Sequence, residues 1–163
     1  MIDETEKQKI FDRALAENKA RIQRIARVNA SGDGCQDLEQ EILFELWKSL
    51  DRYEGRSSLA TWVYRVAINT AREFNRRNRR EPSAVSLSAE SASSSGNTSN
   101  RDPERILDEF IRSLGEVDRM VFLMCLDDLD YHEMSEAINV GEPSLRVRVS
   151  RLKKQFTARY IGT

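Results

Sequence analysis

The sequence has few of the residues that build disulfide frameworks, metal sites and catalytic centres. Its 163 residues include only two cysteines, Cys35 and Cys125, and one histidine, His132. Two cysteines so far apart form neither a disulfide framework nor a CxxC metal motif, so we expect free thiols. With one histidine, no glycine-rich phosphate loop and no nucleophile elbow, the sequence has no constellation for catalysis. We therefore expect a protein that is not an enzyme and that uses no cofactor and no metal.

Long apolar stretches are missing as well. No apolar run approaches the ~18 residues that a membrane-spanning helix needs. The N-terminus, MIDETEKQKIFDRALAENK, is charged where a secretory signal would be apolar. These absences predict a cytoplasmic protein without membrane insertion.

The formal net charge of −1 hides a strongly uneven distribution of charge. Residues 65–80 carry six arginines against one acid, and residues 144–159 carry six basic residues and no acid. Residues 102–142 carry twelve acids against three arginines. Two local basic sites fit a polyanionic partner, whereas the acidic surface remains for some other contact.

The stretch at 55–80, GRSSLATWVYRVAINTAREFNRRNRR, carries two stripes at helical spacing. An apolar stripe is expected to face a core: Leu59, Val63, Val66, Thr70 and Phe74. A second stripe leads into the cluster Arg76, Arg77, Arg79 and Arg80, and consists of Trp62, Arg65, Asn69, Arg72 and Arg76. Guanidiniums bind phosphate, an asparagine reads a base edge and an aromatic ring stacks on bases, so nucleic acid is favoured. Two alternatives stay open: a core position for Trp62, and a basic helix end that only suits the helix dipole.

The rest of the pattern predicts an all-α fold with two small helical domains. The first, residues 1–80, contains a helix from about Glu4, a break at 29–34, a second helix from Gln36 or Asp37, and the basic helix, capped by Ser57 or Ser58. Residues 81–103 contain eight serines and no aromatic residue. This composition predicts a flexible linker, with a surface loop as the alternative.

In the second domain, residues 104–163, the pattern predicts a helix-turn-helix. A helix at 106–114 ends at Gly115 as C-cap, and a buried helix follows at 117–126. Asp130 and Glu133 then form a capping box, and Asn139 and Gly141 tolerate the left-handed conformation of a tight turn. In the last helix four apolar residues face inward, and Ser144, Arg148, Arg151 and Gln155 face outward. The alternative is a helical hairpin with a solvated basic face.

Two blocks of the sequence resemble the extracytoplasmic-function (ECF) sigma factors of bacterial RNA polymerase. The block Asp37-Leu38-Glu39-Gln40-Glu41, with Phe44 and Trp47, resembles the DLxQE-type motif with which that family binds the polymerase clamp. Residues 53–69, YEGRSSLATWVYRVAIN, are similar to the family's signature for opening and reading the −10 element. Residues 131–156 resemble its −35-reading helix-turn-helix, and the resemblance covers about residues 10–158. The chain departs from the family at Gly34-Cys35-Gln36-Asp37, where an acidic stretch is common.

The resemblance implies an alternative sigma factor that binds core RNA polymerase and directs promoter-specific initiation, with a region 2-like domain at 1–80 and a region 4-like domain at 104–163. The implied polymerase-binding residues are Asp37, Leu38, Gln40, Glu41, Phe44 and Trp47. Those implied for the −10 element are Tyr53, Gly55, Ser57, Trp62, Arg65, Asn69, Arg72 and Arg76. Those implied for the −35 element are Ser144, Arg146, Arg148, Arg151 and Lys153. The expected partners are core polymerase and promoter DNA, and the resemblance adds an anti-sigma factor, because members of this family are commonly held by one.

Two other classes of protein fit parts of the pattern. A one-component helix-turn-helix regulator would act without polymerase, and it would dimerise on a palindrome. A helical RNA-binding protein would also carry a basic helix, because basic charge alone does not distinguish DNA from RNA.

Overall fold

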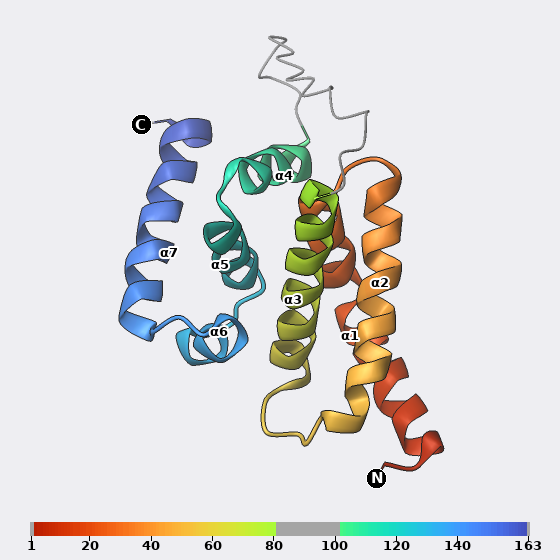
Figure 1. The fold of residues 1–163 in the computed structure, drawn as a ribbon. Coiled ribbons are helices and arrows are strands. Elements are labelled where there is room, and N and C mark those ends of the chain that lie inside the picture. Colours follow the sequence, from red (N-terminus) through yellow and green to blue (C-terminus); the bar gives the residue numbers. More distant parts are fainter. Residues whose placement is uncertain (1, 81–101, 163) are drawn as a thin grey trace.

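The computed structural model describes residues 2–80 and 102–162, and every regular element in these ranges is a helix (Figure 1). The elements are α1 (Glu4–Asn29), α2 (Asp33–Ser49), the 3₁₀ turn η1 (Leu50–Arg52), α3 (Leu59–Arg80), α4 (Pro103–Ser113), α5 (Glu116–Leu126), α6 (Tyr131–Ile138), α7 (Glu142–Phe156) and the π-helical turn η2 (Thr157–Ile161). The predicted all-α fold is confirmed. Residues 81–101 of the predicted linker lie outside the described ranges.

Helices α1, α2 and α3 pack against one another as the predicted three-helix bundle. The apolar stripe of α2 is fully buried at Leu38, Ile42 and Leu46, and it meets Ile22 and Ile25 of α1 in one core. Burial of such side chains is worth roughly 1.5–3 kcal/mol each, which is the main stabilising contribution in a bundle of this size.

Helix α3 is buried around most of its circumference, and the two-stripe pattern underestimated this. Val63, Thr70 and Phe74 of the apolar stripe are buried, and so are Trp62 and Tyr64. The reason is that α3 stands between α1 and α2 on one side and α6 on the other, as Figure 1 shows. Of the two interpretations of Trp62, the core position is therefore the one that the structure shows. Only 6% of its surface is exposed.

Two predicted helix boundaries were wrong, and Gly115 and Gly141 have roles other than those predicted. Helix α2 begins at Asp33, because Gly32 turns the chain with φ of 56°. Gly115 is the N-cap of α5, with φ of −62°, and does not end α4. Gly141 is likewise the extended N-cap of α7, with φ of −61°. Glycine suits an N-cap because an extended backbone is as accessible to it as a left-handed one.

The second unit contains α4 to α7, with the predicted helix-turn-helix in α6 and α7. The capping box is confirmed: the Glu133 backbone N–H donates to Asp130 at 2.8 Å, and the Asp130 N–H donates to Glu133 at 2.9 Å. Asn139 alone provides the left-handed turn, with φ of 56°. Among the helices of the described ranges, none combines the length and apolar character needed to cross a membrane.

Candidate nucleic-acid interface

The loop before α3 folds back onto the start of that helix. Ser58 is the N-cap, because its Oγ accepts a hydrogen bond from the Thr61 backbone N–H at 3.1 Å. The Tyr53 hydroxyl donates to the Ser57 carbonyl at 3.0 Å, and the Tyr53 ring lies 4.9 Å from that of Trp62. Gly55 has φ of 71° at the tip, with open space beside it. The structure thus brings Tyr53, Ser57 and Trp62 together at one end of α3.

The residues of the polar stripe of α3 contact different neighbouring helices. Arg65 donates to the Glu136 carbonyl of α6 at 2.8 Å, and Arg72 forms an ion pair with Glu116 of α5 at 2.6 Å. Asn69 is exposed on the other side, where it lines a hollow of about 250 Å³ together with residues of α2. Farther along, Arg76 pairs with Glu73 on its own helix. The stripe is therefore largely engaged within the chain.

Tyr64 lies in the signature stretch but received no role from the sequence. Its side chain is fully buried, and its hydroxyl donates to the carboxylate of Asp127 just beyond α5. Burial raises the pKa of the Tyr64 hydroxyl well above its usual value, and the charge of Asp127 raises it further. Tyr64 is therefore a neutral donor that joins α3 to the second unit.

Helix α7 lies at the edge of the molecule (Figure 1). Its outer face forms a shallow basic surface. Of the predicted residues, Ser144, Arg146, Arg151 and Lys153 are exposed. Arg148 is only 33% exposed and donates to Asp118 of α5 at 2.6 Å, so it packs against α5 and does not face outward as predicted. Arg151 donates to both oxygens of the same carboxylate, at 3.0 and 3.1 Å. Asp118 thus holds two arginines of α7 at once.

Sequence reasoning missed several residues of this surface, among them Val147, Ser150 and Lys154. Val147 has 66% of its surface exposed, so its side chain is accessible to a partner. The signal was present, because Val147, Ser150 and Lys154 follow one another at steps of three and four. The role of Asp118 had no such signal, since it depends on how α5 packs against α7.

The six residues implied for polymerase binding separate into two groups. Asp37, Gln40 and Phe44 are exposed on one face of α2, at i, i+3 and i+7, and Phe44 has 59% of its surface exposed. The others have intramolecular roles. Leu38 is fully buried, Glu41 pairs with Arg77 of α3, and the Trp47 ring lies 5.2 Å from that of Phe11.

Comparison with known proteins accounts for both units. The family model for sigma-70 region 2 matches residues 15–81, and the model for sigma-70 region 4 matches residues 104–156. The ECF RNA polymerase sigma-E factor of Escherichia coli strain K12 is 31% identical over 144 residues, which cover 80% of this chain and 75% of the relative. The chain belongs to the ECF sigma factor family. The expected membership is therefore confirmed.

This sigma factor is also similar to the sigma-E factor of Haemophilus influenzae, with 25% identity over 142 residues that cover 77% of this chain and 74% of that relative. Two solved structures share its fold. The sigma factor RpoE of Bartonella quintana, in complex with the anti-sigma factor NepR, has a TM-score of 0.70 and 19% identity over 90% of this chain and 94% of that one. CnrH, in complex with the cytosolic domain of CnrY, has a TM-score of 0.65 and 15% identity over 93% and 87% of the two chains.

Proposed function

We propose that this alternative sigma factor binds core RNA polymerase through the exposed face of α2 and directs initiation at promoters read by α3 and α7. The observation that carries the proposal is the separation of the surfaces. Helix α2 exposes the aromatic side chain of Phe44 beside polar residues. Helix α7, a different helix, exposes a basic face. A large enzyme and a DNA duplex can therefore be bound at the same time.

The region 2-like domain, residues 1–80, would read the −10 element and hold it open. Unpaired bases cost a few kcal/mol each to unstack, so they need a site that captures them. The loop from Tyr53 to Ser57, which folds back beside the Trp62 ring, would form one wall of such a site. Arg65, Asn69, Arg72 and Arg76 would contact the adjoining strand.

The region 4-like domain, residues 104–163, would place α7 in the major groove at the −35 element. Arg151 would read a guanine edge, and the exposed Val147 would meet a thymine methyl group. Arg146 and Lys153 would contact phosphates, which fix the position of the helix without reading sequence. The predicted linker would let the two domains bind separate sites, at a spacing fixed by the polymerase.

The proposed setting is the cytoplasm, where polymerase and chromosome are found. One of the solved structures similar to this chain, RpoE of Bartonella quintana, is in complex with an anti-sigma factor. A protein inhibitor of that class is the partner that we propose for regulation of this chain.

Run-off transcription tests the proposal directly. Core polymerase is incubated with a library of promoter fragments, with and without the purified chain. We expect transcripts with defined start sites only when the chain is present. The absence of new start sites, combined with tight binding of the chain alone to a palindromic duplex, would instead favour a one-component regulator.

The Arg151→Ala variant tests the reading of the −35 element. If Arg151 contacts a guanine edge, we expect a loss of ~1–3 kcal/mol of discrimination between the preferred site and a site changed at one base pair. The matched control is Lys153→Ala, which should weaken binding about equally on both DNAs. Affinities of the holoenzyme for the two promoters measure the difference. Equal weakening by Arg151→Ala would reduce Arg151 to a phosphate contact.

A further inference from the structure

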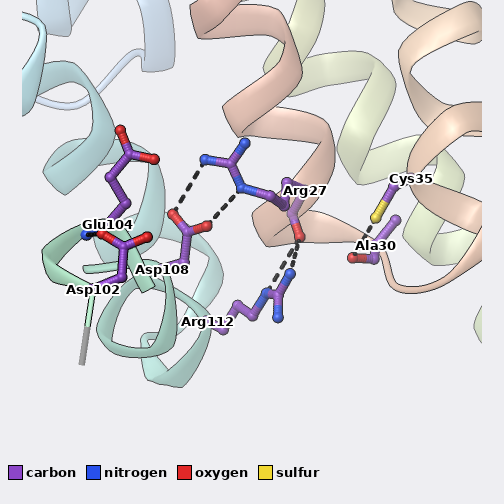
Figure 2. Close-up of polar contacts among 7 residues, drawn as sticks. All are labelled: Arg27, Ala30, Cys35, Asp102, Glu104, Asp108 and Arg112. Atoms are coloured by element: carbon purple, nitrogen blue, oxygen red, sulfur yellow. Dashed lines mark hydrogen bonds and ion pairs between the residues drawn. The ribbon is translucent and has the colours of Figure 1, made fainter. Parts of the chain in front are cut away.

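The carboxylates of the acidic segment at 102–142 have different roles. Asp102 accepts a backbone hydrogen bond at 3.2 Å and caps α4, and Asp108 forms an ion pair with Arg27 of α1 at 2.6 Å (Figure 2). Asp118 lies in the first turn of α5 and contacts α7, the outer helix of its own unit. Its charge therefore acts on the helix that we assign to the −35 element.

Asp118 links two arginines of α7 that differ in exposure. Arg148 donates to Oδ1 from Nη1 at 2.6 Å, and its side chain is 33% exposed. Arg151 donates to both carboxylate oxygens from Nη2, at 3.1 and 3.0 Å, and its side chain is 49% exposed. Arg148, which packs against α5, thus fixes the carboxylate, and the carboxylate in turn holds the more exposed Arg151.

The backbone that carries Asp118 is itself fixed by its neighbour, Arg119. The Arg119 guanidinium donates to three carbonyls at the end of α4 and just beyond it, at 3.1 to 3.3 Å, and these belong to Ile111, Arg112 and Leu114. Helix α7 packs against α5, and its apolar face is buried at Leu145, Val149 and Leu152. The position of the Asp118 carboxylate relative to α7 is therefore set by the core of the second unit.

The pair of Asp118 and Arg151 is better suited to orientation than to stability. Both side chains are partly open to water, and ion pairs of this kind contribute little to the free energy of unfolding. A free arginine side chain, however, loses many rotamers when a ligand immobilises it. Asp118 restricts these rotamers before DNA binds. Because a guanidinium has more N–H donors than one carboxylate uses, Arg151 can still donate to a guanine edge.

The negative charge of Asp118 has a second effect, on contacts with the DNA backbone. A mobile arginine pairs with any phosphate in reach, and such a contact carries no sequence information. A carboxylate beside the guanidinium repels phosphate, and like charges at an interface suppress wrong partners. Holding the arginine and repelling phosphate both favour contact with bases.

We propose that Asp118 is a positioning residue for promoter reading, which holds Arg151 in the orientation in which α7 meets base edges and keeps its guanidinium from phosphates. Its effect on promoters rests on the proposed function of α7, whereas the restriction of Arg151 does not. The test is Asp118→Asn, which keeps the shape of the side chain and removes its charge. The control is Asp128→Asn, the same change at an exposed site beyond α5, where asparagine tolerates the φ of 59°.

Nuclear magnetic resonance of the free full-length chain reports the positioning. Relaxation of the Arg151 Nε–H group distinguishes a restricted side chain from one that moves on the picosecond-to-nanosecond timescale. We expect a restricted Arg151 in the natural chain and in the Asp128→Asn control, and a mobile one in Asp118→Asn. Equal mobility of Arg151 in all of these chains would overturn the proposal, whatever α7 binds.

Affinities of the holoenzyme for two promoters that differ at one −35 base pair report the reading. We expect Asp118→Asn to lower the ratio of the two affinities about tenfold, and the control to keep it. In an Arg151→Ala chain, Asp118→Asn should cause no further fall, because its effect acts through Arg151. An unchanged ratio, or a fall that persists without Arg151, would overturn the role in reading. A mobile Arg151 in Asp118→Asn, with no effect of Arg151→Ala on either promoter, would support the positioning and count against the proposed function of α7.

Discussion

A chain carrying Asp37→Ala and Gln40→Ala is expected to lose about 100-fold in affinity for core polymerase, or about 2.7 kcal/mol. Both residues are exposed on the face of α2 that also carries the exposed Phe44. Polar residues around an exposed aromatic side chain are typical of binding hot spots, where a few side chains carry most of the free energy. Because neither residue is buried, the fold should not change.

The control for this experiment is Gln8→Ala with Asp12→Ala. These residues are the same two types, exposed on α1, and they bond to each other at 2.8 Å. Competition binding against a labelled sigma factor gives the affinity, and the far-ultraviolet circular dichroism spectrum checks the fold. Unchanged association of the Asp37→Ala, Gln40→Ala chain with polymerase would remove α2 as the docking helix.

Replacing Phe110 with alanine is expected to lower the free energy of unfolding of the second unit by ~3–5 kcal/mol. Phe110 is 2% exposed, and its ring lies 5.0 Å from that of Phe122 and 5.1 Å from that of Phe156. Removing the ring leaves a cavity at the junction of α4, α5 and α7. The cost combines lost burial with contacts that the neighbouring rings cannot recover.

Phe44→Ala is the matched control, since it removes the same side chain from a site that is 59% exposed. It should change stability by no more than about 0.5 kcal/mol, and should instead weaken polymerase binding. Urea unfolding followed by circular dichroism measures both variants, with the midpoint shift read at constant slope. Equal midpoints for the two would show that the aromatic cluster does not stabilise the unit.

Features that depend on local chemistry could be predicted from the sequence. The capping box at Asp130 and Glu133, the Asn139 turn and the Ser58 cap each arise from side chains bonding backbone within a few residues. The apolar stripe of α2 could also be predicted, because a helix with one buried face has apolar residues at regular helical spacing in its sequence. Membership of the ECF sigma factor family could be predicted because residues 53–69 form a sequence motif that is specific to that family.

Features that depend on packing between distant segments were not predicted. Tyr64 is polar at one end and lies on neither stripe, and its hydroxyl is bonded by Leu123 and Asp127, which are distant in the sequence. Arg148 has the spacing of an outward residue, but Asp118 draws it toward α5. The roles of Gly115 and Gly141 were wrong because glycine suits both an extended N-cap and a left-handed turn, and composition does not distinguish the two conformations.

The position of Asp118 has a consequence for genetics. One carboxylate fixes the rotamers of both Arg148 and Arg151. If α7 reads the promoter as proposed, a selection for strains that use altered promoters should recover changes at Asp118, although this acid would repel the DNA backbone and would contact no base. Such alleles would imitate recognition-helix mutants, and suppressors of them would map to α7.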